Sequence, residues 1–285
     1  MRAKPRSAGG SSLPVRYAGA VTAIKQGPIK QVQIERISRS ALGRLDLRQA
    51  QADRVVVEAP LAILARGQRV LTVMRTPGHD EELVAGLLHA EALPRAALRA
   101  LPGQGGESWV DVDLDPAAFA PRPVASAAGC GLCGRLTIAD LERSARAVAS
   151  DLTVRAEVVA GLPAQLRERQ AVFADTGGLH GAALATSAGE LRVVREDVGR
   201  HNAVDKVIGW ALAVAEPPGQ RVLVVSGRLG YEIVQKAVAW GAPVVVAVSA
   251  PSSLAIEVAE RFRVALCGFS RGDRFNVYSH GWRIE

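Results

Sequence analysis

The pair Cys130 and Cys133 is the part of the sequence that could do chemistry most directly. The two cysteines lie in a run with three glycines, Gly129-Cys-Gly-Leu-Cys-Gly134. A Cys-x-x-Cys pair can hold half of a zinc site, act as a redox dithiol, or carry sulfur. A thioredoxin-like dithiol directly opens a helix, whereas the helix predicted here begins only near Thr137. The glycines predict a mobile loop that suits a thiolate with two partners, but the spacing alone leaves carrier and dithiol open.

A zinc site is another interpretation of the pair. His89-Ala90-Glu91 matches the H-x-E half of zinc deaminases, in which His and two Cys hold zinc and Glu moves protons. Here Gly129 stands where those enzymes have proline, and the stretch from Glu91 to Cys130 is long. We therefore favour His89 as a residue on a helix flank and expect no metal site. Cys267 lies in an apolar strand pattern and is expected to be a small buried hydrophobe.

The composition is that of a globular protein with an excess of arginine. The 285 residues are 48% hydrophobic and 22% charged, with a net charge of +7, and lysine supplies only 5 of the 35 cations. Arginine forks bind phosphates and carboxylates, so a small anionic ligand or an acidic protein partner fits. The cations are mixed with acids and aromatic residues make up 4%, which argues against a nucleic-acid partner. No apolar run approaches the ~20 residues of a membrane span, and no secretory signal is visible. We expect a cytoplasmic protein without a membrane partner.

The hydrophobic pattern divides the chain into four parts. Residues 1–20 carry cations without an acid and are expected to form a disordered basic tail. Residues 21–128 are predicted to be a β-rich N-terminal portion, residues 129–135 the Cys-x-x-Cys loop, and residues 136–285 an α/β body. The predicted fold class is therefore α/β.

Alternation and helical periodicity place the elements within these parts. The N-terminal portion is predicted to hold a hairpin tip at Gly67-Gln68, a helix over 81–91, and strands near 31–38, 55–57, 70–74 and 109–114. The body is predicted to hold strands near 181–186, 191–195, 221–226, 243–248, 263–268 and 274–279. Its helices are predicted after residue 137 and over 162–172, 201–214, 230–240 and 252–261. Short β-branched runs between helices indicate a sheet covered by helices.

Polar residues follow two predicted strands of the body, at the point where each strand ends. Ser226-Gly227-Arg228 and residues 249–253 precede predicted helices. In α/β sheets ligands gather at the carboxyl ends of strands, and helix N-termini bind phosphates. Ser252 and Ser253 could equally be N-caps, but a cap does not explain Arg228. Ser226 and Arg228 are therefore candidate binding residues.

Two pairs of charged residues in the body have a structural interpretation beside a functional one. Arg271 and Arg274 flank Gly272-Asp273 in a predicted hairpin, where they could bind phosphates or be solvated. Lys236 follows Glu232 by four residues, which predicts an exposed helical ion pair.

Two histidines of the body are candidate bases or ligand contacts. His180 follows two glycines, and His201 stands at a helix start among polar residues. Asp197 precedes the same helix and could cap it.

Several longer motifs, in one order, resemble a known protein family. The resemblance covers roughly residues 30–280, and the family is the formate dehydrogenase accessory sulfurtransferases, FdhD. The motifs are Gly129-Cys-Gly-Leu-Cys-Gly134, Thr176-Gly-Gly-Leu-His180, Glu196-Asp-Val-Gly-Arg-His-Asn-Ala203 with Asp205-Lys206, Ser226-Gly-Arg228 with Glu232 and Lys236, Ser249-Ala-Pro-Ser-Ser-Leu254, and Gly268-Phe-Ser-Arg-Gly-Asp-Arg-Phe-Asn-Val-Tyr278.

The resemblance implies a sulfurtransferase with a cytidine deaminase-like α/β body that forms a homodimer. Sulfur would come from a cysteine desulfurase and pass to the molybdenum cofactor, Mo-bis(molybdopterin guanine dinucleotide), which formate dehydrogenase needs. The cofactor would be a bound substrate, and no permanent cofactor is implied. Cys130 matches the persulfide-bearing cysteine and Cys133 its partner. The stretch that matches cofactor binding is Phe269, Ser270, Arg271, Gly272, Asp273 and Arg274.

The sequence departs from the family pattern at three positions. Gly230 stands where a hydroxyl residue is expected, and His89 and Ala92 also differ. Two other classes of protein stay open beside the sulfurtransferase. One is a zinc-dependent deaminase-like hydrolase that would use His89, Glu91, Cys130 and Cys133, and the other is a non-catalytic chaperone that binds the cofactor.

Overall fold

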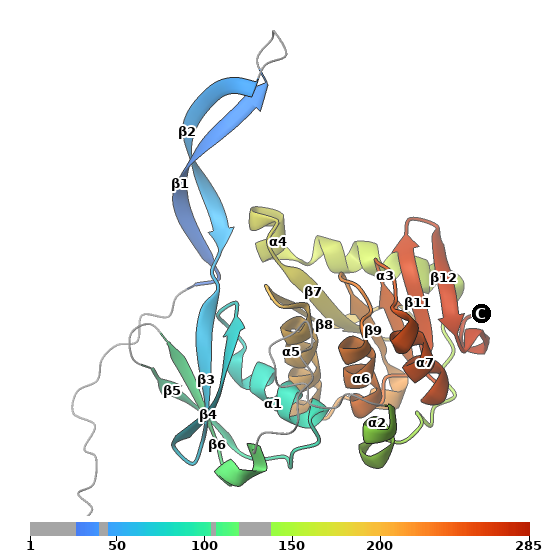
Figure 1. Ribbon diagram of the computed structural model, residues 1–285. Helices are drawn as coiled ribbons and strands as arrows, with labels where there is room; N and C mark the ends of the chain where they lie inside the picture. The colour runs from blue at the N-terminus through green and yellow to red at the C-terminus, as the bar shows by residue number, and fades with distance from the viewer. Residues whose placement is uncertain (1–26, 40–44, 104–106, 120–137) are drawn as a thin grey trace, which may run out of the picture.

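The computed structural model describes residues 27–39, 45–103, 107–119 and 138–285, and Figure 1 draws these ranges as ribbons. The predicted basic tail and the Cys-x-x-Cys loop with Cys130 and Cys133 lie outside the described residues. Within these ranges the strands form a two-stranded, a four-stranded and a six-stranded sheet.

The four-stranded sheet and one helix form a layer of their own. Its strands are β3 (Ala59–Ala65), β4 (Gln68–Arg75), β5 (Leu98–Pro102) and β6 (Ser108–Val112), in the order β4-β3-β6-β5. Helix α1 (Asp80–Ala90) has three acids in its first turn, which favours its N-terminus. Its Leu83 and Leu87 pack on Ile63 and Val110 of the sheet. The predicted hairpin is confirmed, because the chain turns between β3 and β4 at Gly67, which has a φ of +81°.

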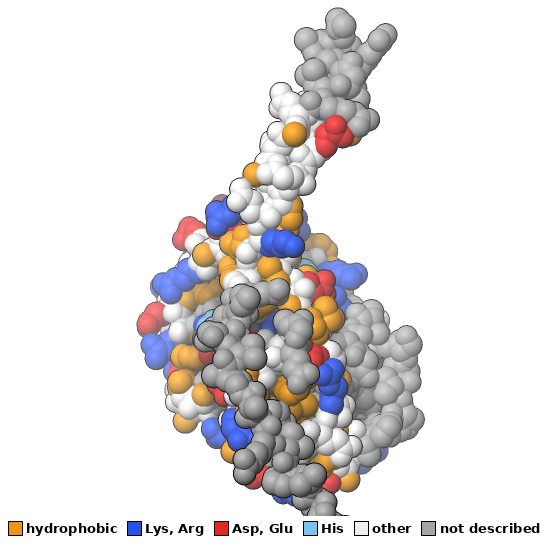
Figure 2. Space-filling view, turned by 90° about the vertical axis from the view of Figure 1, so that its left-hand side faces the viewer, with side chains coloured by type: hydrophobic (Ala, Val, Ile, Leu, Met, Phe, Trp, Pro, Cys, Tyr) orange, Lys and Arg blue, Asp and Glu red, His pale blue; other side chains and the backbone are white. Residues whose placement is uncertain are grey.

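Strands β1 (Ile29–Arg39) and β2 (Leu45–Val56) form an antiparallel arm that leaves the rest of the molecule. Figures 1 and 2 show the arm as a narrow projection. Its base contacts helix α4 (Ala171–Thr176), where the guanidinium of Arg54 lies 2.8 Å from the carboxylate of Asp175. Within the described part of the chain the arm forms a sheet of only two strands.

The six-stranded sheet forms the centre of the body. It contains β7 (His180–Ala185), β8 (Leu191–Asp197), β9 (Val222–Val225), β10 (Val244–Ala247), β11 (Ala265–Arg271) and β12 (Arg274–Ser279), in the order β12-β11-β10-β9-β7-β8. Strands β9, β10 and β11 are parallel, and the others are antiparallel to their neighbours. Every residue of β9 and β10 is buried, as expected for parallel strands covered on both faces.

Helices cover both faces of this sheet. One face packs against α2 (Ile138–Ser144), α5 (Arg200–Ala213), α6 (Tyr231–Trp240) and α7 (Ser253–Arg261), and the other packs against α3 (Ala156–Glu168). Strand alternation explains the two cores: Leu223 and Val225 point to the first, and Val222 and Val224 to the second. Three short 3-10 turns in the described ranges complete the fold, η1 (Pro116–Phe119), η2 (Pro218–Gln220) and η3 (Gly281–Arg283).

The mixed α/β class is confirmed, and one predicted helix is wrong. The expected helix over 162–172 is two helices, α3 and α4, which are separated at Arg169 and Gln170. Glu196 of β8 explains the break, because its carboxylate accepts hydrogen bonds from the backbone N–H groups of Val172 and Phe173 and so starts α4 separately.

Helices α1 and α5 join the two layers through glycines. A Cβ at Gly86 would overlap the carbonyl oxygen of Asp205, and a Cβ at Gly209 would overlap that of Glu82. Because the backbones touch, α5 is covered by the six-stranded sheet on one side and by α1 on the other. No helix among the described residues has the length and apolar character that a membrane span requires.

Candidate functional site

Polar side chains from four strands meet at one edge of the six-stranded sheet. The parallel strands β9, β10 and β11 all end at this edge, and the antiparallel strands place the start of β7 and the end of β8 there. His180 therefore lies opposite Asp197 in the register, and Ser226 and Ser270 follow at the ends of β9 and β11. This is the edge at which α/β sheets bind ligands.

Three helices of the body also begin at this edge. α5 starts after Gly199, α6 after Gly230 and α7 after Ser252, each just beyond a strand that ends there. The positive ends of the helix dipoles therefore point toward the same region. The capping interpretation of Ser252 is confirmed, since its hydroxyl oxygen accepts a hydrogen bond of 3.2 Å from the N–H of Ala255.

A pocket of about 590 Å³ opens beside this edge. One part of its lining comes from the sheet and the hairpin after β11, and it includes five residues that the sequence predicted or singled out: His180, Ser226, Ser270, Arg271 and Gly272. The other part comes from α3, α4 and the turn after them. These lining residues are Ala160, Pro163, Ala164, Arg167, Gln170, Phe173, Gly177, Gly178 and Leu179, and Val248 completes the pocket.

The predicted stretch 269–274 forms the hairpin between β11 and β12. Gly272 has a φ of +60°, which the tight turn requires. Ser270 is fully buried and its hydroxyl donates to the carbonyl of Val159 at 3.4 Å. Arg271 donates from Nε to the carbonyl of Val248 at 3.2 Å, which leaves its terminal nitrogens at the pocket. Asp273 and Arg274 are exposed at the tip and do not line the pocket.

Phe269 takes an unusual backbone conformation at the start of this stretch. Its φ is +52°, and the β11–β12 register shifts there. The residue is 44% exposed. A bulky residue in the left-handed region is strained, and such strain concentrates at functional sites.

Ser226 and Arg228 have different surroundings at the end of β9. The Ser226 hydroxyl accepts a hydrogen bond of 2.9 Å from the N–H of Gly181, so it ties β9 to β7 while lining the pocket. Arg228 is exposed and makes no ion pair with a described residue. The structure thus brings Ser226 to the pocket and leaves Arg228 outside its lining.

His180 and His201 lie in one polar cluster with Arg200 and Glu232. Burial, and then the charge of Arg200, lower the pKa of His180, so its imidazole is neutral at neutral pH. The Nε2 of His201 lies 3.7 Å from the carboxylate of Glu232. His201 holds the pKa of Glu232 at about 2, against the effect of burial. The cluster therefore contains a neutral imidazole beside charged groups at the pocket edge.

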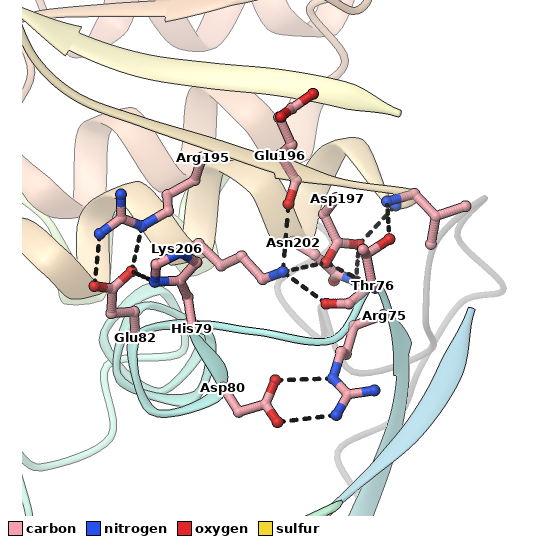
Figure 3. A network of polar contacts seen from close by, with 12 residues as sticks. Arg75, Thr76, His79, Asp80, Glu82, Arg195, Glu196, Asp197, Asn202 and Lys206 are labelled. Atoms are coloured by element: carbon pink, nitrogen blue, oxygen red, sulfur yellow. Dashed lines mark hydrogen bonds and ion pairs between the residues drawn. The ribbon is translucent and has the colours of Figure 1, made fainter. Parts of the chain in front are cut away.

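Asp197 is a buried anchor rather than a helix cap (Figure 3). Its carboxylate lies 2.7 Å from the ammonium of Lys206 and accepts hydrogen bonds from the N–H groups of Thr76 and Gly199 and from the amide of Asn202. Lys206 also donates to the carbonyl of Thr76 at 2.9 Å. The prediction that Asp197 caps the helix is therefore corrected: Gly199 starts α5, and Asp197 ties it to the turn after β4.

A second contact in Figure 3 holds α1 against β8. Arg195 donates from two nitrogens to the carboxylate of Glu82, at 2.6 and 2.8 Å. Burial raises the pKa of Glu82, but Arg195 and His79 outweigh burial and hold it at about 2.

The predicted pair between Lys236 and Glu232 is wrong. Lys236 is buried, and its ammonium lies 2.7 and 2.9 Å from the two carboxylate oxygens of Asp205. Lys236 pairs with Asp205 because α6 turns its side chain toward α5 and away from solvent. Burial raises the pKa of Asp205, although Lys236 acts in the opposite direction.

The other residues that could bind a metal or act as a thiol are buried or bonded to the backbone. His89 bonds through Nε2 to the carbonyl of Ala239 at 3.0 Å, in agreement with a residue on a helix flank. Glu91 is buried at the end of α1. Cys267 is fully buried, as predicted, and burial raises the pKa of its thiol to about 12. Among the described residues no cluster of three metal-ligating side chains occurs.

Sequence reasoning missed the wall of the pocket that α3 and α4 provide. Arg167, Gln170 and Phe173 belong to no recognisable motif. The predicted single helix over 162–172 placed Arg167 and Gln170 on continuous helical faces and ended before Phe173. The nearby Gly177-Gly178 pair was the available signal. A Cβ at Gly178 would lie 2.9 Å from Val56, so glycine lets the base of the arm approach the pocket.

Known proteins resemble this chain over most of its length. The sequence model of the FdhD/NarQ family matches residues 56–285. The chain is 46% identical to "Sulfur carrier protein FdhD" of Nocardia farcinica over 82% of this chain and 88% of that protein. It is 42% identical to the protein of the same name from Thermoplasma acidophilum, over 82% of this chain and 87% of that protein. A crystal structure assigned as a formate dehydrogenase accessory protein from Desulfotalea psychrophila has a TM-score of 0.70 and 26% identity, covering 90% of this chain and 99% of that one.

Proposed function

The chain belongs to the FdhD/NarQ family, and from this we propose that it is a sulfurtransferase of formate dehydrogenase maturation. It receives sulfur from a cysteine desulfurase as a persulfide on Cys130. It then passes the sulfur to the molybdenum cofactor, Mo-bis(molybdopterin guanine dinucleotide), which it binds as a substrate. The observation that carries the sulfur-transfer role is the 46% identity to a protein named as a sulfur carrier.

The cysteine chemistry needs no oxidant. The Cys130 thiolate attacks the terminal sulfur of the donor persulfide, a new S–S bond forms, and the donor leaves as a thiolate. A reactive thiolate must be accessible and have a lowered pKa. Cys267 has the opposite properties, since it is buried with a pKa of about 12, and it takes no part in the transfer. Cys133 is the partner of Cys130 in this scheme.

The pocket at the sheet edge supports an anionic substrate. Arg271 and Arg167 line it and make no ion pair with any described residue. The N-termini of α5, α6 and α7 point toward the same edge. A pyrophosphate-bearing cofactor is stabilised by such free cations and by helix dipoles. We assign its binding to the stretch from Phe269 to Arg274, with Ser226 in the pocket and Arg228 beside it.

The other parts of the proposal come from the family. The protein works as a homodimer in the cytoplasm with a desulfurase and a formate dehydrogenase as partners. Its six-stranded sheet corresponds to the body of cytidine deaminases. Among the described residues, the contact of His89 Nε2 with the carbonyl of Ala239 counts against a zinc-dependent hydrolase that uses this nitrogen as a ligand.

Intact mass spectrometry after incubation with a cysteine desulfurase and cysteine tests the proposal. We expect a gain of one sulfur, about 32 Da, that maps to Cys130 and is reversed by reductant. The Cys130→Ala variant should gain none, while Cys267→Ala, the matched control, should gain as much as the unmodified protein. A Cys130→Ala protein that still sulfurates the cofactor at the normal rate would leave a cofactor-binding chaperone as the better account.

A further inference from the structure

We propose that a cavity between α1, α5 and the turn after α1 binds a small hydroxylated aromatic acid, with Arg95 pairing with its carboxylate and His89 accepting a hydrogen bond from its hydroxyl group. The cavity has a volume of about 190 Å³. Its described lining comes from the layer of the four-stranded sheet and from α5 of the body, and it shares no residue with the pocket at the sheet edge. No step of the proposed sulfur transfer uses this cavity, so the inference goes beyond the proposed function.

The size and lining of the cavity match one aromatic ring. Aliphatic surface comes from α1, the turn, β5 and α5, through Leu88, Leu93, Leu98 and Leu212. An apolar cavity of about 150 Å³ is enough to hold benzene. At about 190 Å³, this cavity holds one ring with a small substituent. Burial of the ring removes apolar surface from water and therefore supplies most of the affinity.

Backbone contacts hold the walls of the cavity in place. Gly209 lines it, and a Cβ at Gly209 would overlap the carbonyl oxygen of Glu82, so α1 and α5 touch beside it. Arg95 donates from Nη2 to the carbonyl of Leu212 at 2.8 Å, which ties the turn to the end of α5. Because the walls are fixed in the free protein, a ligand binds with little loss of conformational entropy.

His89 provides a hydrogen-bond acceptor in the lining. Its Nε2 lies 3.0 Å from the carbonyl oxygen of Ala239, which can only accept, so Nε2 carries the proton. Burial lowers the pKa of His89, the Ala239 carbonyl opposes this effect, and Arg95 adds to it, so the imidazole is neutral at neutral pH. Nδ1 of the neutral ring is then an acceptor, and no described residue donates to it. A hydroxyl group on the ligand supplies the donor.

Arg95 provides a cation at the mouth of the cavity. Its side chain is exposed although it lines the cavity, and its bond to Leu212 uses only Nη2. Arg95 makes no ion pair with a described residue, so its other N–H groups are free for a carboxylate. A hydroxybenzoate carries a ring, a hydroxyl group and a carboxylate in one small molecule, and it therefore represents the ligand class.

Titration of the isotope-labelled full chain with 4-hydroxybenzoate, benzoate and phenol, followed by NMR, tests the inference. Benzoate lacks the hydroxyl group, and phenol lacks the carboxylate. The amide signals of Leu93 and Ala213 report on the cavity, whereas those of Gly177 and Gly178 report on the pocket at the sheet edge. The experiment therefore locates each probe as well as measuring its affinity.

Three variants and one control separate the contributions. His89→Phe removes the acceptor, and Arg95→Gln removes the cation. Arg99→Gln is the matched control, because Arg99 is an exposed cation on β5 that does not line the cavity. Ala213→Leu fills the cavity from an exposed position of α5, and it keeps the inference testable if loss of the His89 contact unfolds the chain. Thermal melting shows whether each variant is folded.

We expect 4-hydroxybenzoate to bind the cavity about fivefold more tightly than benzoate. His89→Phe should remove this difference. Arg95→Gln should weaken both acids about threefold and leave phenol unchanged, since an exposed ion pair contributes little. Arg99→Gln should behave as the unmodified protein, and Ala213→Leu should bind no probe in the cavity. Equal affinity of the unmodified protein for the two acids, or signal shifts confined to the pocket at the sheet edge, would overturn the inference.

Discussion

Gly86 of α1 lies against the carbonyl oxygen of Asp205 in α5, with no room between them for a side chain. The reciprocal contact of Gly209 with Glu82 lies on the same pair of helices. These contacts set the distance between the layer of the four-stranded sheet and the body. They also set the position of α5, whose first turn carries Arg200 and His201 at the pocket edge.

The Gly86→Ala substitution is therefore expected to destabilise the protein. The added methyl group forces the two backbones apart, at a cost of about 1–3 kcal/mol or more. Chemical denaturation followed by circular dichroism measures the free energy of unfolding. Gly161→Ala is the control, since its Cβ would have only the end of the Gln165 side chain as a neighbour, at 3.9 Å. Equal unfolding free energies for the two variants would contradict the steric account.

Lys236→Met is expected to destabilise the protein strongly, by about 3–5 kcal/mol, because it leaves the Asp205 carboxylate buried without its cation. The double variant Lys236→Met/Asp205→Leu should recover part of this loss. The measurement compares the free energies of unfolding of the unmodified protein, Lys236→Met and the double variant.

The loss in Lys236→Met should also depend on pH. Burial raises the pKa of Asp205 above its ordinary 3.8 while Lys236 opposes the rise, so removal of Lys236 raises this pKa further in the variant. The variant therefore loses more stability than the unmodified protein as pH rises above that value. The variant should therefore be closer to the unmodified protein near about pH 5 than near about pH 8. A loss that is the same at both would argue against a charged Asp205.

Arg200→Gln is expected to raise the pKa of His180 toward 6.5, since Arg200 is the largest charge that lowers it after burial. Titration of the imidazole signals by NMR gives the value directly. Arg228→Gln, which removes a nearby exposed cation, should leave it unchanged.

The lowered pKa of His180 also makes the stability of the protein depend on pH. The contribution of neutral His180 is complete above about 6.5 and is lost as pH falls, because the unfolded chain binds the proton more readily. A His180→Gln protein should therefore lose less stability on mild acidification. An unmodified protein that gains stability on such acidification relative to the variant would contradict this assignment.

Cys267 is expected to resist alkylation in the folded protein. Its thiol is buried and its pKa is raised to about 12, so little thiolate exists near neutral pH. Iodoacetamide labelling of a Cys130→Ala/Cys133→Ala protein isolates this thiol for mass spectrometry. Labelling should begin only when denaturant unfolds the chain, and rapid labelling without denaturant would show that β11 opens readily.

The arm of β1 and β2 is expected to exchange its amide hydrogens much faster than β10. A two-stranded ribbon is marginally stable alone, and the described contacts hold only the base of this one, through Arg54 and Val56. Hydrogen exchange with mass spectrometry compares the two segments within one sample. Equal protection would indicate that another surface covers the arm in solution.

The elements of the body could be predicted well from the sequence because their patterns are local. The valine-rich runs of β9 and β10 lie between helices with clear periodicity, and the predicted ranges differ from the observed strands by one residue at each end. The break between α3 and α4 could not be predicted in this way. It depends on the carboxylate of Glu196, more than twenty residues further along the chain.

Side-chain partners were predictable only where they are near in sequence. The Ser252 cap needs a residue three positions away, so the sequence offered capping as one of two interpretations of this serine. The partner of Lys236 is Asp205, 31 residues away, so the local rule selected Glu232 instead. Arg167, Gln170 and Phe173 could not be recognised as pocket residues from the sequence, because only the fold places them beside Arg271.

The buried bond from Lys206 to the turn at Thr76 spans 130 residues of chain. Helix α1 therefore leaves the ribosome long before α5, the helix that covers it. At a synthesis rate of about 5–20 residues per second, roughly 6–25 seconds pass before its partner is made. During that time the face of α1 that will meet α5 is exposed in the nascent chain.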